Sequence, residues 1–538
     1  MKNREEIKQK IESMSQDELV DFFINKEQKL TEQEQELKWL KEQMAMLNKL
    51  RFSTKSEKVI SGQLNLFNEV EDVVDNSEEV EEETVPAKQK KKKRKEANFS
   101  KLPTRIIEHT LEDTHCEVCG SNLKELASQI IDVLKYQPAR YVVERHIVHQ
   151  YICPTCTDEN LEAEITIASG APKRLIKGSV VSASVVAGIA CNKYVDGTPL
   201  YRQEQELKRK KVEVSRANMS NWLMKCGEKL EPLYQKMQED FKSLAHTHMD
   251  ETTVTVLEDK KEGRQKSYMW MGCSGKWEEK QMALYFYHEN REHSYALEIM
   301  GEAYAGGIHS DGYEAYHKFE KAMIFGCMAH ARRKFVEAME VDAQHAIAKK
   351  MKKEQLPVFY KEHPSYANIV NIIDQIRYLF QWEQAYIDEK ITPKEIAKRR
   401  QEEQTSVLDE LFKRLEQYRE EYTNQSKMGK AIQYALNQKA YLMNYLKDGA
   451  SELSNNRGER QIKPFVIGRK NWLFSNTKSG ARMSSIYYSL MESAKLNHLD
   501  IHGYLEYVLE EIQNKGETLD YNKLLPYASE LPKSLKIN

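Results

Sequence analysis

The chain has 538 residues, a formal net charge of −2 and 30% charged residues. This length exceeds one ordinary hydrophobic core and predicts roughly three to four domains. No apolar stretch approaches the ~20 residues of a membrane span, and the first residues lack the apolar segment of a signal peptide. We therefore expect a soluble cytoplasmic protein with no membrane partner, whose other partners depend on how charge is distributed along the chain.

The first segment, residues 1–59, is predicted to be helical. Leu37, Leu40, Met44 and Leu47 follow the a/d spacing of a short coiled coil. This spacing favours self-association of the chain. The alternative is a helical hairpin that packs on its own chain.

Residues 60–99 have the composition of a linker. Acidic residues crowd positions 69–83, and the basic run "KQKKKKRK" covers positions 88–95. Blocks of like charge repel and stay solvated, so we favour a disordered tether. The alternative is a basic arm that contacts DNA phosphates.

Two C-x-x-C pairs, "CEVCG" and "CPTC", lie within residues 100–170 and contain Cys116, Cys119, Cys153 and Cys156. Four thiolates suit a tetrahedral Zn²⁺ ion. The 33 residues between the pairs exceed the usual ribbon spacing. The cysteine pattern still predicts a structural zinc site, because two pairs in one module favour metal over redox chemistry.

Residues 171–240 are predicted to form three helices, over 180–194, 199–210 and 215–230. Ser215 is the expected N-cap of the third helix. Basic residues cluster around the second and third helices, so we expect a helix-turn-helix that faces the major groove of DNA. A three-helix module without DNA contact is the alternative.

From residue 241 the pattern changes to strands rich in apolar and aromatic residues. We expect three strands, a helix, two strands and a helix, over 245–258, 266–275, 281–291, 293–305, 306–312, 322–330 and 331–340. This order predicts an α/β RNase H-like core. Its first three strands form an antiparallel meander, and its fourth strand lies beside the first.

Two acidic residues occupy matching places in this expected core. Asp250 lies in the first strand and Asp311 ends the fourth, so the fold would bring them side by side. Adjacent carboxylates repel unless cations lie between them. Two Mg²⁺ ions held by carboxylates are suited to in-line phosphoryl transfer, and the pattern then lacks only a third carboxylate.

The third carboxylate is found after a long, charged helical stretch. Residues 455–482 hold seven basic residues and one acidic residue, Glu459. We expect the helix that carries Glu459 to stop at Pro464, because the residue before proline avoids the helical region. Glu459 would then lie in the last turns of that helix, which packs on the sheet.

Four stretches of the sequence resemble the transposases of the IS66 family of bacterial insertion sequences. They are "HMDET", "HSDGYEAY", "CMAHARRKF" and "NNRGERQIKPFVIGRKNWLFSNTKSGA". The resemblance covers nearly the whole chain. It implies a DDE transposase whose RNase H-like core is interrupted by a helical insertion, with Asp250, Asp311 and Glu459 as its catalytic residues and Mg²⁺ ligands. It also implies a bacterial protein that associates with the nucleoid when bound to DNA.

The expected domains follow from these patterns. They are a helical or coiled-coil segment (1–59), a linker (60–99), a zinc-binding domain (100–170), a helix-turn-helix-like domain (171–240), the first part of the core (241–335), a helical insertion (336–445), the second part of the core with Glu459 (446–495) and a helical tail (496–538).

The expected reaction has two in-line displacements at phosphorus. Water attacks the phosphodiester at the end of the insertion sequence, and the freed 3′-hydroxyl attacks target DNA. The cofactors are two Mg²⁺ ions, for which Mn²⁺ can substitute, and structural Zn²⁺. The partners are double-stranded DNA (terminal inverted repeats and target), further copies of the chain in a synaptic complex, and accessory proteins encoded by the same element.

Two alternatives stay open for the function. One is a nuclease of the same fold that cleaves without joining. The other is a DNA-binding regulator on an inert core.

Basic and aromatic residues near the carboxylates are expected to contact DNA. They are Arg332, Arg333, Arg460, Lys463, Arg469, Lys470 and Trp472. Three of them have a structural alternative: core packing for Trp472, and a solvated helix start for the two arginines that follow "CMAH". Glu459 has one as well, a salt bridge with Arg457 or Arg460.

Overall fold

The computed structural model describes residues 173–264 and 266–537, together with residues 15, 19, 20, 22, 24, 26, 29, 33, 141–147, 149–151, 166 and 167. The leucine repeat, the charged linker and the four paired cysteines lie outside the described residues. The chain divides into a unit of residues 75–145 and a unit made of residues 1–74 and 146–538. Only 141–145 of the first unit are described, and they are exposed. All that follows concerns the second unit.

Three helices precede the sheet, as predicted. They are α6 (Ala183–Tyr194), α7 (Leu200–Arg209) and α8 (Arg216–Phe241). Ser215 caps α8 by accepting the Asn218 N–H at 3.2 Å, as expected. Buried residues of these helices belong to the same hydrophobic cluster as those of the sheet. The boundary expected at residue 240 therefore does not separate two hydrophobic cores.

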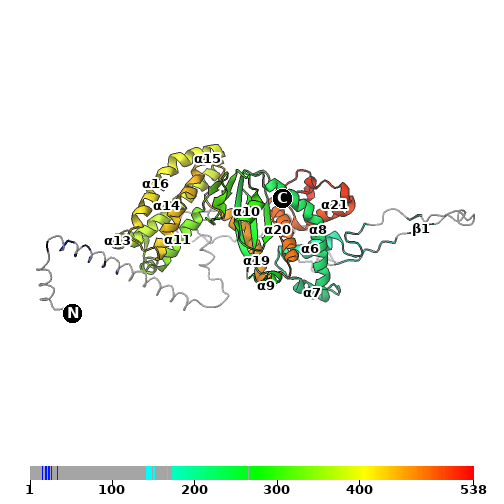
Figure 1. Cartoon of the computed structure of the whole chain (residues 1–538). Helices are drawn as coiled ribbons and strands as arrows, with labels where there is room; N and C mark the ends of the chain where they lie inside the picture. Colours follow the sequence, from blue (N-terminus) through cyan, green and yellow to red (C-terminus); the bar gives the residue numbers. More distant parts are fainter. Residues whose placement is uncertain are drawn as a thin grey trace, which may run out of the picture. The chain divides into compact units, whose positions relative to one another are not determined.

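A mixed five-stranded sheet follows α8, drawn in green in Figure 1. Its strands are β3 (His246–Val254), β4 (Ser267–Ser274), β5 (Ala283–His288), β6 (Gly307–His309) and β7 (Met323–Phe325). Their order is β5-β4-β3-β6-β7. The first three strands pair antiparallel, and β6 and β7 continue parallel to β3. The expected meander, with the fourth strand beside the first, is thus observed.

Two C-terminal helices pack on this sheet. Helix α19 (Asn456–Trp472) lies against β3 and β4, and α20 (Lys478–Leu496) lies against the edge strand β5 (Figure 1). Ser489 and Ser493 of α20 accept the backbone N–H groups of Tyr285 and Ala283, at 2.8 and 2.9 Å. An edge strand otherwise presents unpaired N–H groups, so these serines satisfy β5 where no further strand pairs with it.

The stretch expected to be a helical insertion is helical. It contains α11 (Met328–Val341), α12 (His345–Ala348), α13 (Leu356–Glu362), α14 (Pro364–Asp388), α15 (Pro393–Arg399), a π-turn (Arg400–Gln404), α16 (Thr405–Tyr418), α17 (Lys427–Asn437) and α18 (Lys439–Met443). Its buried side chains form a second hydrophobic cluster. Phe325 of β7 and Cys327 also belong to this cluster, so the insertion core begins where the sheet ends.

The remaining elements are shorter or lie at the chain ends. They are β1 (Gln150–Tyr151), β2 (Thr166–Ile167), α9 (Leu257–Lys261), α10 (His293–Met300) and α21 (Ile501–Lys515), which packs on α6. Among the described residues, none of the helices has the length and hydropathy needed to cross a membrane.

Several predicted boundaries are wrong. Helix α8 continues to Phe241, past the expected end at residue 230, and β6 ends at His309, before Asp311. Helix α19 does not stop at Pro464 but continues through it to Trp472. A proline inside a helix removes one hydrogen bond, yet Ile462 and Phe465 are buried on either side of it, and this packing overrides the local preference. The strand expected over 322–330 is also too long, because β7 ends at Phe325 and α11 begins at Met328.

Candidate active site

Asp250 and Asp311 each lie two residues after a histidine, and these two histidines are paired on neighbouring parallel strands. His248 of β3 and His309 of β6 are a register pair, and each aspartate comes two residues after its histidine. Because side chains alternate along a strand, Asp250 lies on the same side of the sheet as His248. Asp250 Oδ1 accepts the backbone N–H of the next residue at 2.8 Å. Asp250 therefore lies in the middle of β3, beside the segment that follows the end of β6 and contains Asp311.

Glu459 lies in the first turn of α19, not in the last turns of its helix as we expected. The error follows from the misplaced helix end at Pro464. The amino end of a helix carries a partial positive charge, which favours a carboxylate in the first turn. Since α19 packs on β3 and β4, its first turn brings Glu459 toward the strand that holds Asp250.

The neighbouring carboxylates act electrostatically on Asp250. Burial is the largest effect on Asp250 and raises its pKa well above the usual range. Nearby negative charges raise the pKa of Asp250 further, and they come from Glu251, Asp311 and Glu459. A carboxylate in this position is stabilised by a cation.

Glu251 is a fourth carboxylate, which sequence reasoning missed. It forms an ion pair with Arg291 and accepts the Tyr316 hydroxyl at 2.6 Å. Burial raises its pKa, while Tyr316 and Arg291 lower it. The sequence signal that could have identified Glu251 is its position directly after Asp250. Neighbouring residues of a strand point to opposite faces, so we regard Glu251 as a structural ion-pair partner.

Two residues of α11 contact the carboxylate of Glu459. Arg333 Nη2 lies 3.2 Å from Oε2, and His330 Nδ1 lies 3.2 Å from Oε1. Arg333 Nη1 also lies 3.2 Å from His330 Nε2. Because guanidinium only donates, His330 accepts at Nε2 and carries its hydrogen at Nδ1, which lies near Glu459 but makes no hydrogen bond. The arginine partner of Glu459 is thus Arg333, which we had expected to contact DNA.

Arg457, one of the two arginines that the sequence offered as a salt-bridge partner of Glu459, makes different contacts. Its Nε donates to the Ser274 carbonyl at 2.7 Å, and its guanidinium also binds Gln281. Arg457 therefore attaches the start of α19 to the end of β4.

The residues expected to contact DNA fall into two groups. Arg460, Lys463 and Lys470 of α19 are exposed. Arg469 instead donates to the hydroxyls of two β3 threonines, at 3.1 Å each. Trp472 is half-buried, with its ring centroid 5.5 Å from that of Phe465. This geometry favours the core-packing interpretation of Trp472. Arg332, on α11, is half-buried.

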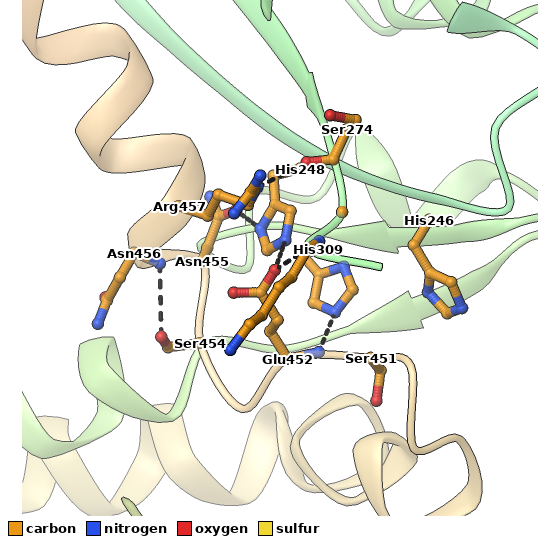
Figure 2. Close-up of polar contacts among 12 residues, drawn as sticks. His246, His248, Ser274, His309, Ser451, Glu452, Ser454, Asn455, Asn456 and Arg457 are labelled. Carbon is orange, nitrogen blue, oxygen red and sulfur yellow. Dashed lines mark hydrogen bonds and ion pairs between the residues drawn. The ribbon is translucent and has the colours of Figure 1, made fainter. Parts of the chain in front are cut away.

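A buried polar network, also missed from the sequence, connects the loop before α19 with β3 and β6 (Figure 2). His248 contacts Glu452 through Nε2 and Asn455 through Nδ1, each at 3.0 Å. The Asn455 amide donates to the Met249 carbonyl at 2.9 Å, and the Glu452 N–H donates to His309 at 2.8 Å. These contacts attach the loop before α19 to both β3 and β6.

Two groups of side chains among the described residues have the composition of a metal site. Asp259, Glu262 and Glu289 form one group, but Lys478 and Arg264 already provide its positive charge. Cys327, His330 and Glu459 form the other, with ligand atoms within 4.8 Å of one another.

Comparison with known families gives four matches along the chain. Residues 178–483 match a model described as "Transposase IS66 family", and residues 489–527 match the "IS66 C-terminal element". Residues 113–157, which include all four paired cysteines, match the "zinc-finger binding domain of transposase IS66". Residues 39–107 match the "Transposase C of IS166 homeodomain". The zinc-finger match supports a structural Zn²⁺ ion in this region.

Similar proteins come from Sinorhizobium fredii, and all are described as uncharacterized. Protein y4qI is 28% identical over 380 residues, which cover 66% of this chain and 64% of y4qI. Protein y4jD is 26% identical over 430 residues, which cover 77% of this chain and 78% of y4jD. The chain thus spans under two thirds of y4qI. Since the IS66 transposase model matches more than half of the chain, the protein belongs to the IS66 family of transposases.

Proposed function

We propose that this protein is a DDE transposase with an RNase H-like core, in which Asp250, Asp311 and Glu459 are the catalytic carboxylates. The observation that carries the proposal is their arrangement on three elements. Asp250 and Asp311 follow one register pair of two central parallel strands, and Glu459 enters from the helix that packs on the same strands. The strand order β5-β4-β3-β6-β7 supports the fold assignment.

The carboxylates suit Mg²⁺, for which Mn²⁺ can substitute. Mg²⁺ prefers oxygen ligands and is bound by one or two carboxylates together with phosphate oxygens. Asp250 is buried beside other carboxylates and is electrostatically unfavourable without a cation. Two ions, when bound, would supply Lewis-acid activation of water or a 3′-hydroxyl and would stabilise the leaving oxygen.

The chain's own residues orient this chemistry. His248, Asn455 and Glu452 fix the start of α19 to the strands that carry the aspartates. Arg333 Nη2 lies 3.2 Å from Glu459 Oε2. We propose that a DNA phosphate attracts Arg333, because guanidinium pairs with phosphate as well as with carboxylate, and this exchange would free Glu459 for a cation.

The proposed DNA surface follows one face of α19. Arg460, Lys463 and Lys470 are spaced by three and seven residues and are all exposed, so they lie on one face of the helix. Positive charges of this kind bind the phosphate backbone. Arg332 and Arg333 would extend the surface from α11. Arg469 and Trp472 would support it indirectly, through their contacts with β3 threonines and Phe465.

Several further parts of the proposal concern the rest of the chain. Cys116, Cys119, Cys153 and Cys156 would hold the structural Zn²⁺, and residues 171–240 would recognise the ends of the element. Further copies of the chain and accessory proteins of the same element would complete the complex. The domain boundaries proposed are 1–59, 60–99, 100–170, 171–240, 241–335, 336–445, 446–495 and 496–538.

The test is an in vitro reaction with the element's own ends, a target plasmid and Mg²⁺. Wild type should give nicked ends and joined products. Asp250→Asn, Asp311→Asn and Glu459→Gln should each abolish both products and keep binding to the ends. Glu298→Gln, at an exposed position of α10, is the matched control and should keep activity.

The same reaction separates the two alternatives from the proposal. Cleaved ends without joined products would favour the nuclease of the same fold. Binding to the ends without any cleavage by wild type would favour the regulator. Normal cleavage by any one of the three carboxylate variants would show that its assigned role is wrong.

A further inference from the structure

A thiol, an imidazole and a carboxylate meet at the start of α11. Cys327 precedes the first residue of α11, His330 lies in its first turn, and Glu459 comes from the first turn of α19. Their ligand atoms lie within 4.8 Å of one another. We infer that these three residues bind a soft divalent ion such as Zn²⁺, and that this ion inhibits the protein by withdrawing Glu459 from Mg²⁺. The inhibition, but not the binding, rests on the proposed function.

The distance between two of the ligand atoms already fits such an ion. His330 Nδ1 and Glu459 Oε1 are 3.2 Å apart. Two Zn²⁺ bonds of about 2.05 Å at a tetrahedral angle separate a nitrogen and an oxygen by about 3.3 Å. A metal ion can therefore bridge these two atoms with little movement of either side chain, and His330 Nδ1 makes no hydrogen bond that the ion would have to replace.

The third ligand is the thiol of Cys327. In a tetrahedral Zn²⁺ site the sulfur lies about 3.6 Å from the nitrogen, given Zn–S bonds of about 2.3 Å. The outer limit of 4.8 Å leaves at most an adjustment of about 1.2 Å. Burial raises the pKa of the Cys327 thiol to about 12, and the Asn455 N–H, 3.1 Å from Sγ, partly opposes this shift because an N–H group donates to a negative charge. Water can occupy the fourth position.

Ion binding releases one proton from Cys327 and moves one within His330. The Cys327 thiol releases its proton to solvent when Sγ binds the ion, because only the thiolate is a ligand. His330 carries its hydrogen at Nδ1 in the metal-free protein, as its contact with Arg333 requires. That hydrogen moves to Nε2 when Nδ1 becomes the ligand, so the imidazole stays neutral.

Arg333 opposes the ion and should keep the site weak. Its guanidinium lies 3.2 Å from both His330 Nε2 and Glu459 Oε2. The ion adds positive charge beside it, and protonation of Nε2 removes the hydrogen bond that Arg333 donates to His330. Removal of the guanidinium should therefore tighten ion binding, which distinguishes this site from an ordinary structural zinc site.

The chemistry of Cys327 and His330 favours Zn²⁺ or Co²⁺ over Mg²⁺. Thiolate and imidazole suit Zn²⁺ or Co²⁺, whereas Mg²⁺ takes oxygen ligands. Mg²⁺ would use Glu459 together with Asp250 and Asp311, and Zn²⁺ would use Glu459 together with Cys327 and His330. Glu459 cannot serve both sites at once, so the two ions should compete.

The binding experiment is a titration of the full-length, zinc-loaded chain with Co²⁺. Wild type should gain a thiolate-to-cobalt charge-transfer band, and Cys327→Ser and His330→Ala should both lose it. Arg333→Gln should give the band at a lower Co²⁺ concentration, by about tenfold if one adjacent charge is removed. Cys226→Ser removes another buried thiol, in α8, and should behave as wild type.

Two results would overturn the inference. One is the absence of a new band in wild type, and the other is the same band in Cys327→Ser. The inhibition is tested separately, as the fraction of Mg²⁺-dependent cleavage that remains at each Zn²⁺ concentration relative to the same variant without added Zn²⁺. Wild type should be inhibited and Cys327→Ser resistant, and equal inhibition of both would refute the competition. If wild type binds Co²⁺ but never cleaves, the proposed function fails and the binding site stands.

Discussion

His248 of β3 and His309 of β6 stack with their ring centroids 4.2 Å apart, two residues before Asp250 and Asp311 on the chain. Both rings are fully buried or nearly so. His309 accepts the Glu452 N–H, and His248 contacts Asn455 and Glu452 (Figure 2). The loop that precedes Glu459 is therefore bound to both strands that carry the aspartates.

Asn455 is the residue of this network that is simplest to test. Asn455→Ala leaves the Met249 carbonyl and His248 Nδ1 without their partner, and it should lower the free energy of unfolding by about 1–3 kcal/mol. It should also raise the Mg²⁺ concentration needed for half-maximal cleavage, because Glu459 lies only four residues after Asn455 and its position depends on how this loop is held. Urea unfolding and a Mg²⁺ titration measure the two effects. Asn437→Ala, at an exposed position of α17, should change neither, and a variant of Asn455 with normal Mg²⁺ dependence would contradict the positioning role.

Arg400 provides a second test of how the insertion supports this loop. Its side chain is 2% exposed, pairs with Glu383 and donates to the carbonyls of Asp448 and Ser451, at 2.6 and 3.0 Å. Arg400→Met leaves the half-buried Glu383 carboxylate without its cation and two carbonyls without their donor, and should cost about 3 kcal/mol in unfolding free energy.

The neighbouring residue is a matched control for Arg400. Arg399 forms a surface ion pair with Glu389, and such pairs contribute little. Arg399→Met should therefore leave the urea midpoint close to that of wild type. Equal midpoints for the Arg400 and Arg399 variants would refute the importance of the buried pair.

The pH dependence of stability should include a contribution from His288. Burial lowers its pKa to about 4, against about 6.5 in the unfolded chain, and its ring stacks on Tyr295 with centroids 4.0 Å apart. Between these values the unfolded chain binds a proton that the folded chain does not, so stability falls as pH drops from about 6.5 to 4, by at most about 1.4 kcal/mol per pH unit. His288→Gln should remove this part of the slope, as measured by urea unfolding at pH 7, 6 and 5. His502→Gln, on α21, should keep it.

The DNA surface on α19 predicts a change in salt dependence. Lys463→Gln and Lys470→Gln should each weaken binding to the element's ends and reduce the slope of log K against log salt by about 1. Binding isotherms between low and physiological salt measure the slope. Lys439→Gln, on α18, is the control and should leave it unchanged. An unaltered slope in both α19 variants would show that Lys463 and Lys470 do not contact DNA phosphates.

Local patterns predicted much of the fold but little of the network around the carboxylates. Alternation in "HTHMDETTV" places Asp250 inside a strand, and the order of the strands places Asp311 near it. The end of α19 was mispredicted, because Pro464 acts locally while the packing of Phe465 does not. The contacts of His248 with Glu452 and Asn455 join residues more than 200 positions apart, so no periodicity of the sequence reveals them.

The partner of Glu459 was hidden for the same reason. Arg333 lies 126 positions before it in the chain, and a nearby arginine in the basic segment was the simpler choice. "CMAH" was assigned to a strand, which placed Cys327 and His330 away from any helix start. Once α11 begins at Met328, the spacing of three residues between Cys327, His330 and Arg333 places them on one face over two successive turns.

A charged Asp250 side chain should lower the free energy of unfolding. Burial and the neighbouring carboxylates raise its pKa well above the usual range, so its negative charge destabilises the metal-free fold. Asp250→Asn removes this charge and keeps an oxygen that can accept the same backbone N–H. Without divalent ions the variant should be more stable than wild type by about 0.5–2 kcal/mol, as for other strained active-site residues.

Added Mg²⁺ should reverse this order, because an ion that binds only the folded wild type stabilises it by mass action. Thermal unfolding with and without Mg²⁺ measures both effects. Asp409→Asn, at an exposed position of α16, should follow wild type in both conditions. If Asp250→Asn is less stable than wild type without ions, the carboxylate contributes a structural interaction that outweighs its repulsion. If it responds to Mg²⁺ as wild type does, Asp250 is not required for the ion.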